Sequence, residues 1–548
     1  MIILGLFLAL FQVALCENPM ICLDQGACFK GSWMQTETGN RFAAFYGIKY
    51  AEDPVKNLRF KAPKPFQAPQ GLWDVSQDPQ ISCVQVDKIV QETPFGQEDC
   101  LVLNVYVPES AILNQDSLPV MAWIHGGALK LGAGYYQQYG PQIFMDKKII
   151  LVSINYRLGI FGFLSLGDEI VPGNAGFRDQ NLALKWVHEN IENFFGDPEK
   201  VTIFGQSAGG ESVSYHLISP KSRGLFRRAI MQSGTVLNAW GRPWKPELVE
   251  FTKLKSLEAV GCPLENAFTC LIEKSAAELS EATFKIIYNP VLDAKFTNDP
   301  FVPADPNEIF ENGQFDTDLE ILIGTNKEDG MIIVFDPLAN SSLWQDWQNN
   351  IDTIGPRSIL TIVDDSFITD DDILKARKII EFYLGSVENL NSEHEREILD
   401  MYTDAKFLHG TYRILKYFLD FHVPIFHYIL TYQGQYSFSE FYDVSKIGVC
   451  HADDLFYLFD PVFGHYGDYP LDNPDDLLLR EEMTSAWTNF AKYGDPTPPN
   501  SQNIWNSWTP LDKSNPLSFF NISGSNSAMT EDSQIMARME FWDSLNLE

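Results

Sequence analysis

The chain has 548 residues, of which 45% are hydrophobic, so it can bury a large core and has material for more than one domain. Its 73 acidic residues against 40 basic residues give a formal net charge of −33. A field of that sign repels nucleic acid and anionic membrane surfaces, which excludes both as partners.

The N-terminus carries a pattern typical of a targeting segment. Residues 2–15 are apolar apart from one glutamine. This run is too short to span a bilayer, and it stands where a signal peptide belongs. Because Ala14 and Cys16 are small enough for a cleavage site, we predict a signal peptide over residues 1–16, with cleavage before Glu17. No later stretch approaches a membrane span, and we expect a secreted, extracellular protein.

The cysteines and two tripeptides agree with secretion. Seven cysteines follow the predicted signal peptide, and six of them form closely spaced pairs, as in disulfide-bonded extracellular chains. Asn340 and Asn521 stand in acceptor patterns for N-glycosylation. Cys450 is left over, and we expect a buried structural thiol there. Proximity favours three disulfides, Cys22–Cys28, Cys83–Cys100 and Cys262–Cys270.

Strand and helix patterns alternate along the chain. The clearest helical pattern covers residues 179–195, where apolar side chains recur every three or four positions. Such alternation predicts an α/β fold with a large, mostly parallel sheet flanked by helices. Since no internal repeat or long linker occurs, we expect one domain over residues 17–548. Apolar and β-branched runs predict strands at 120–125, 149–155, 201–204, 320–324 and 424–428.

One predicted strand ends in a motif with a chemical meaning. The strand 201–204 runs directly into Gly205, Gln206, Ser207 and, two residues later, Gly209. In this setting GxSxG is the nucleophile elbow, in which small residues allow a sharp turn from strand to helix around an exposed serine. Alone the motif is a weak signal, because any surface turn could contain it. The prediction that Ser207 is a nucleophile depends on finding its partners.

A second turn could supply the oxyanion hole. Gly126, Gly127 and Ala128 directly follow the strand 120–125, where small residues allow backbone N–H groups to converge on a developing negative charge. We expect donors from Gly127, Ala128 and Ala208, the last of which follows the predicted nucleophile. The alternative is an ordinary tight turn at the end of a strand.

The acid and the base should follow Ser207 in that order along the chain. The strand 320–324 leads into a loop with two adjacent carboxylates, Glu328 and Asp329, and both are candidates for the acid. Several histidines lie beyond this loop, so order alone does not select one. His451 is favoured because it stands in a loop that follows a predicted strand.

These motifs together resemble those of the type-B carboxylesterase and cholinesterase family, a group of α/β-hydrolases. The resemblance extends over nearly the whole chain and implies the α/β-hydrolase fold with helical insertions. It also implies the loop disulfides Cys83–Cys100 and Cys262–Cys270, whereas Cys22–Cys28 is not part of the family pattern. The matching residues are 45–48, 58–60, 98–101, 103–106, 125–129, 155–159, 173–176, 179–180, 205–210, 232–234, 324–330, 448–454 and 487–491.

The resemblance assigns the acid to Asp329 and the base to His451, and the sequence departs from it at several positions. The family usually has glutamate where Asp329 stands, so Glu328 remains a rival. Cholinesterases generally have glutamate at Gln206, and the glutamine here is similar to secreted insect carboxylesterases, including juvenile hormone esterases. Choline esters are therefore disfavoured. Leu129 replaces a common phenylalanine, and we expect it and Gln206 to shape the substrate pocket.

The resulting prediction is a serine carboxylesterase that hydrolyses a small, hydrophobic ester through an acyl-enzyme, with no cofactor and no metal, because no spacing suits zinc and no phosphate-binding loop occurs. One alternative is a juvenile hormone, odorant or pheromone esterase. An alternative of another class is a non-catalytic adhesion protein related to neuroligins. The presence of Ser207 and His451 favours an enzyme.

Overall fold

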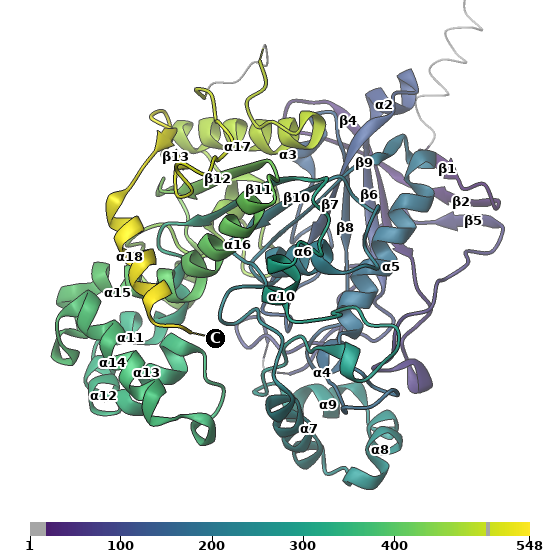
Figure 1. The fold of residues 1–548 in the computed structure, drawn as a ribbon. Coiled ribbons are helices and arrows are strands. Elements are labelled where there is room, and N and C mark those ends of the chain that lie inside the picture. The colour runs from purple at the N-terminus through teal and green to yellow at the C-terminus, as the bar shows by residue number, and fades with distance from the viewer. Residues whose placement is uncertain (1–17, 92, 500–504, 548) are drawn as a thin grey trace, which may run out of the picture.

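The computed structural model describes residues 18–547 except 92 and 500–504, so the predicted signal peptide lies outside the described residues. A large central sheet organises the fold (Figure 1). From one edge to the other its 11 strands are β14 (Ala528–Thr530), β13 (Phe519–Ile522), β12 (Ile425–Leu430), β11 (Glu320–Asn326), β10 (Arg228–Gln232), β9 (Gly196–Gln206), β7 (Leu118–Ile124), β8 (Ile150–Ile154), β6 (Val102–Pro108), β4 (Arg41–Lys49) and β3 (Ser32–Gln35).

The middle of this sheet is parallel and its ends are antiparallel. The strands from β13 to β8 in the order above run parallel, whereas β14 at one edge and β6, β4 and β3 at the other pair antiparallel. Strands such as β8 and β12 are buried over their whole length, as expected where helices cover both faces of a sheet. The predicted mostly parallel α/β sheet is confirmed, and all five predicted strands lie in its parallel part.

Helices cover both faces of the sheet (Figure 1). On one face lie α5 (Ala175–Asn190), α6 (Ala208–Ile218) and α16 (His409–Asp420), and on the other lie α17 (Pro474–Tyr493) and α3 (Gln142–Met145). The helix predicted over residues 179–195 corresponds to α5 and the short 3-10 turn Ile191–Phe194 that follows it.

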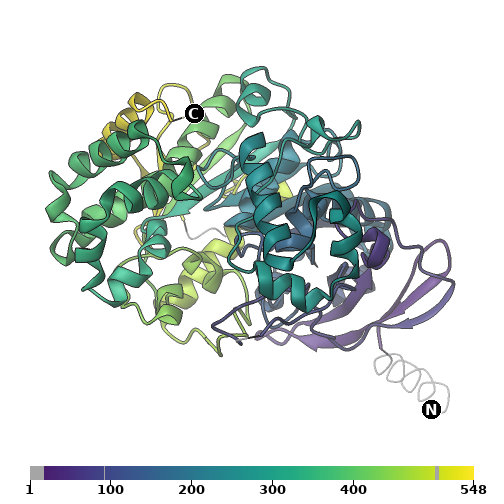
Figure 2. The ribbon, with the colours of Figure 1, turned by 90° about the horizontal axis from the view of Figure 1, so that it is seen from below.

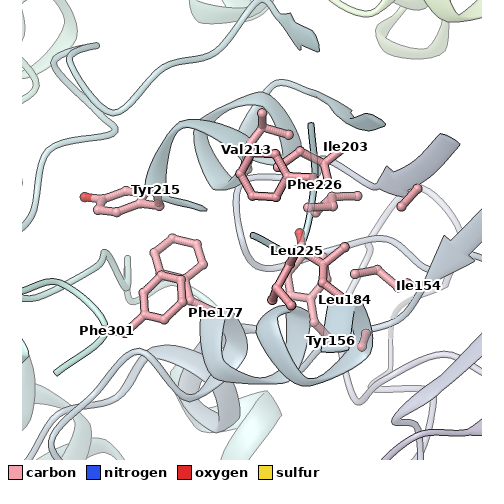
Figure 3. Packing of buried hydrophobic residues seen from close by; sticks show 14 of the residues in the cluster. Ile154, Tyr156, Phe177, Leu184, Ile203, Val213, Tyr215, Leu225, Phe226 and Phe301 are labelled. Carbon is pink, nitrogen blue, oxygen red and sulfur yellow. The ribbon is translucent and has the colours of Figure 1, made fainter. Parts of the chain in front are cut away.

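Aromatic packing fixes the position of α6, the helix that follows the elbow (Figure 3). The ring of Phe177 on α5 lies 4.6 Å from the ring of Tyr215 on α6 and 5.5 Å from the ring of Phe301, measured between centroids. Val213 on α6 and Ile203 on β9 belong to the same buried cluster. Two elements that flank the elbow are thus held against one continuous core.

Two further groups of helices are inserted between the strands, and Figure 2 shows them on different sides of the molecule. The first contains α7 (Pro246–Val260), α8 (Ala267–Glu273) and α9 (Ala276–Thr283), and the second contains α11 (Phe335–Ala339), α12 (Leu343–Asn349), α13 (Ile351–Leu360), α14 (Asp370–Leu384) and α15 (Glu395–Thr403). None of the described helices is long and apolar enough to cross a bilayer. The other α-helices of the described residues are α2 (Glu109–Asn114), α4 (Gly159–Phe163), α10 (Pro306–Glu311) and α18 (Ser533–Ser544).

A separate small sheet near the N-terminus contains β1 (Met20–Cys22), β2 (Ala27–Lys30) and β5 (Gly71–Asp74). Cys22 and Cys28 lie directly opposite each other on β1 and β2 and are joined by a disulfide. The structure also joins Cys83 to Cys100 and Cys262 to Cys270, and it leaves Cys450 buried as a free thiol. The Cys22–Cys28 disulfide therefore closes the hairpin that β1 and β2 form.

A π-helix, Asp404–Leu408, connects α15 to α16 and places a lysine in the interior. π-Helical turns of this kind are rare and often lie at functional sites. The Nζ atom of Lys406 donates a hydrogen bond to Thr361 Oγ1, and burial lowers the pKa of Lys406 to about 7. The neighbouring Phe407 ring lies 4.8 Å from the ring of His451.

We expect Lys406→Met to stabilise the protein near neutral pH. A lysine in an unfolded chain has a pKa of about 10.4, so between pH 7 and pH 10 the unfolded state binds more protons than the folded state, and the stability of the wild type rises with pH. Removing the buried charge should add about 1–4 kcal/mol at pH 7. Calorimetric unfolding at pH 7 and pH 9 should show a higher melting temperature for the variant, by a margin that shrinks at pH 9. A margin that is the same at both pH values would contradict the expectation.

Candidate active site

Ser207 occupies a sharp turn between β9 and α6. Its backbone has φ of 59° and ψ of −126°, a conformation that non-glycine residues rarely adopt. The two flanking glycines are required, because a Cβ atom on Gly205 would lie 2.5 Å from the Gly209 carbonyl carbon and one on Gly209 would lie 2.1 Å from Ile124 O. The strand and the helix therefore approach as closely as the GxSxG motif predicts, with the half-buried serine at the tip of the turn.

His451 and Asp329 form a buried pair beside this turn. The distance from His451 Nδ1 to Asp329 Oδ1 is 2.8 Å, and Asp329 Oδ2 accepts a hydrogen bond of 2.9 Å from the backbone N–H of Asn326. Both side chains are almost fully buried. The Asp329 carboxylate can only accept a hydrogen bond, so Nδ1 of the neutral His451 ring carries the proton. The lone pair of the ring is therefore on Nε2. The histidine can therefore accept a proton at Nε2.

Glu328, the rival carboxylate, is directed elsewhere. Its Oε2 accepts a hydrogen bond of 2.8 Å from the backbone N–H of Val449, and its Oε1 lies 3.5 Å from the Nζ of Lys327. A Cβ atom on Gly448 would lie 2.6 Å from its carboxyl group, so that glycine makes room for it. Glu328 thus anchors the loop that precedes His451, while the shorter Asp329 reaches the imidazole.

Gln206, the last residue of β9, contacts the other side of the imidazole. Its Nε2 lies 3.2 Å from His451 Nε2, which fits an amide N–H donating to the ring's lone pair. Among the hydrogen bonds of the described residues, none joins Ser207 Oγ to His451. In the absence of substrate such contacts are often long or unformed, and they tighten in the complex. The Gln206 amide therefore lies at the ring nitrogen that can accept a proton.

The backbone turn after β7 lies against Ser207. A Cβ atom on Gly126 would lie 3.2 Å from Ser207 Cβ. Gly127 and Ala128 have φ of 103° and 55°, and among the described residues their N–H groups have no hydrogen-bond acceptor. Ala208 N–H belongs to the first residue of α6. These three N–H groups, which the sequence predicts as oxyanion donors, thus lie on segments that flank the serine.

Gln85, which the sequence analysis missed, holds this turn in place. Its Oε1 accepts a hydrogen bond of 2.8 Å from Gly132 N–H, and its Nε2 donates one of 3.0 Å to Gly132 O. Gln85 lies in the loop closed by the Cys83–Cys100 disulfide. On the other side, Tyr156 OH donates to His125 O over 2.8 Å. Since Gln85 and the turn are far apart in sequence, no local sequence motif predicts this contact.

A cavity of about 380 Å³ opens onto Ser207 and His451. Most of its wall is apolar or aromatic, as is typical of pockets that bind small hydrophobic molecules. Gln206 lines this cavity, whereas Leu129 does not: its side chain is only 2% exposed and belongs to the buried core. The apolar and aromatic residues of the wall include Leu131, Ile160, Phe161, Phe284, Ile286, Ile332, Phe438, Leu455 and Phe463.

Further buried groups support the histidine loop. Asp454 Oδ2 accepts a hydrogen bond from Gln232 Nε2, and burial raises the pKa of Asp454 to about 6. Asn326 Nδ2 donates to Cys450 O over 2.7 Å. Burial also raises the pKa of the Cys450 thiol, and this residue does not line the cavity. The sequence expectation of a structural thiol therefore fits its surroundings.

A serine on a strand–helix elbow, a buried histidine–carboxylate pair and a backbone turn beside the serine, all carried by a mostly parallel sheet, define an α/β-hydrolase. The chain belongs to the carboxylesterase family, whose model matches residues 17–542. It is a carboxylic ester hydrolase of the serine esterase type, as the resemblance in its sequence predicted.

Similar proteins belong to the same class of enzyme. The chain is 34% identical to a juvenile hormone esterase from Tribolium castaneum over 98% of this chain and 97% of the relative. It is also 34% identical to a carboxylic ester hydrolase from Bombus ignitus over 94% of this chain and 92% of the relative. Among solved structures it is similar to juvenile hormone esterase from Manduca sexta with OTFP covalently attached, with a TM-score of 0.82 and 28% identity over 96% of this chain and 99% of that chain.

The contact between Gln206 and His451 predicts a change in pH dependence. In Gln206→Glu a carboxylate would face the imidazole and favour its protonated form, which cannot act as a base. The acid limb of the kcat/KM profile on p-nitrophenyl butyrate should therefore move to higher pH by about one unit. Gln206→Met, which removes the amide without adding charge, serves as the control. An acid limb that stays in place in Gln206→Glu would show that the two side chains do not interact.

Proposed function

We propose that Ser207, His451 and Asp329 form the catalytic triad of this esterase. His451 Nε2 takes the proton of the Ser207 hydroxyl as its oxygen attacks the ester carbonyl, and Asp329 orients the ring and stabilises the imidazolium. The tetrahedral intermediate collapses when His451 donates that proton to the leaving alcohol. The observation that carries this proposal is the 2.8 Å pair of His451 and Asp329 beside the strained Ser207 turn.

The same groups complete the reaction with water. His451 removes a proton from a water molecule, the hydroxide attacks the acyl carbon, and Ser207 leaves with the proton returned by His451. In both halves of the reaction the N–H groups of Gly127, Ala128 and Ala208 stabilise the oxyanion. Their fixed positions matter, because preorganised donors need no rearrangement as the negative charge develops.

We infer that the substrate is a small, hydrophobic ester. The largely apolar cavity beside Ser207 supports this inference, since burial of an apolar acyl or alcohol group contributes about 25 cal/mol per Å². A juvenile hormone esterase is the more specific candidate, because two of the similar proteins carry that name. An odorant or pheromone esterase would use the same chemistry, whereas a neuroligin-like adhesion role would leave the paired His451 and Asp329 without a purpose.

We further propose that the mature protein is one secreted domain, residues 17–548, released by cleavage of the signal peptide. Its disulfides support an extracellular location. Asn340, exposed after α11, is accessible to a glycan. Asn521 is half-buried on β13, and its Oδ1 accepts a hydrogen bond of 2.6 Å from Thr431, so a glycan there would have to be attached before the strand pairs.

The assignment of the acid is testable with a matched pair of variants. Asp329→Asn should lower kcat about 10³- to 10⁴-fold, because the amide cannot stabilise the imidazolium and favours the wrong tautomer. Glu328→Gln should stay within a few-fold of the wild type, since the amide oxygen can still accept from Val449 N–H. Steady-state hydrolysis of p-nitrophenyl butyrate distinguishes the two. The proposal fails if Glu328→Gln is the inactive variant and Asp329→Asn retains activity.

A further inference from the structure

Three ammonium groups converge on one residue of the cavity wall. Phe284, which follows α9, accepts a hydrogen bond of 2.7 Å at its carbonyl oxygen from Lys130 Nζ. The Nζ atoms of Lys88 and Lys285 lie 4.8 Å and 5.6 Å from the centroid of the Phe284 ring. These lysines come from three separate segments of a chain whose net charge is −33. Of the three lysines, Lys130 is the one that lines the cavity.

Lys130 belongs to the same turn as the proposed oxyanion donors. Its backbone N–H donates a hydrogen bond of 2.9 Å to Gly127 O, so the Cα atoms of the two residues lie within about 7 Å of each other. Lys130 and Ser207 line one cavity. A group bound to the Lys130 ammonium and an ester bound at Ser207 can thus belong to one small molecule.

The Lys130 ammonium can donate more hydrogen bonds than the described residues accept from it. Among the ion pairs of the described residues none includes Lys130, and Phe284 O is the one acceptor that the described hydrogen bonds give it, although an ammonium has three donors. Burial lowers the pKa of Lys130. The carboxylate that lines the cavity, Asp87, already accepts hydrogen bonds from Tyr466 OH (2.8 Å) and Ile89 N–H (3.0 Å).

A half-buried cation without a counter-ion gains most from an anionic ligand, because the interaction is less screened there than at the surface. We propose that Lys130 is a specificity-determining residue that makes this esterase prefer esters with a carboxylate at the non-reacting end, such as half-esters of aliphatic dicarboxylic acids. The carboxylate binds the Lys130 ammonium while the methylene chain contacts the apolar wall and the ester carbonyl reaches Ser207. This inference rests on the proposed function of Ser207, and it narrows the hydrophobic ester proposed above to one with an apolar chain and a charged far end.

The test compares two esters of the same length. Mono-p-nitrophenyl adipate carries a free carboxylate, and methyl p-nitrophenyl adipate lacks the charge. In the wild type kcat/KM should be higher for the charged ester, and in Lys130→Met the ratio of charged to neutral should fall about tenfold, as for the loss of one charge-assisted hydrogen bond. Lys130→Arg should restore the ratio. Lys64→Met, which removes one exposed positive charge away from the cavity wall, should leave the ratio unchanged.

Two results would overturn the inference. A wild type without preference for the charged ester would show that the ammonium does not select substrates. An equal loss for both esters in Lys130→Met would show that Lys130 only ties the turn to Phe284. Ser207→Ala distinguishes failure of this inference from failure of the proposed function. If Ser207→Ala still hydrolyses both esters, Ser207 is not the nucleophile, whatever the ratio of kcat/KM for the charged and neutral esters. Inactivity of that variant, together with an unselective wild type, refutes only the role of Lys130.

Discussion

The strained backbone of Ser207 is the constraint on which the site depends. A residue at φ of 59° and ψ of −126° costs on the order of 1–3 kcal/mol and persists only where its surroundings hold it. Here Ser207 N–H donates to Gln232 O over 2.8 Å, and Gly234 packs so closely that a Cβ atom on it would lie 2.0 Å from Ser207 O. The neighbouring strand and the buried helix α6 thus keep the serine at the tip of the turn, where its hydroxyl can reach the cavity.

The parallel sheet brings the other groups to the same edge. The turn at Gly126 follows β7, Ser207 follows β9 and Asp329 follows β11, so each lies at the carboxyl end of a parallel strand, where α/β folds place their ligands. His451 comes from the loop after β12, which Glu328 anchors through Val449 N–H. The Cys83–Cys100 loop and the end of α9 form part of the cavity wall around this edge. The positions of these groups therefore follow from strand order, whereas much of the cavity wall comes from the loops and inserted helices.

Much of this arrangement could be predicted from local sequence rules, and the exceptions have physical causes. The five predicted strands lie in the parallel part of the sheet, where burial on both faces requires continuous apolar runs; the short strand β10, which begins at Arg228, has no such signal. The choice between Glu328 and Asp329 needs the spatial register of two loops. Leu129 was expected in the pocket, but its side chain packs in the buried core, which a sequence motif does not reveal. Gln85 makes its contact across a long separation in sequence, so no motif contains it.

Covalent labelling of the serine tests the central claim most directly. An organophosphate such as diisopropyl fluorophosphate phosphorylates an activated serine nucleophile, and peptide mass spectrometry identifies the modified residue. Because His451 activates only a serine that its Nε2 can reach, the account predicts one phosphorylated peptide, with the adduct on Ser207 and loss of esterase activity in proportion to labelling. An adduct on another residue, or full activity after complete labelling of Ser207, would contradict it.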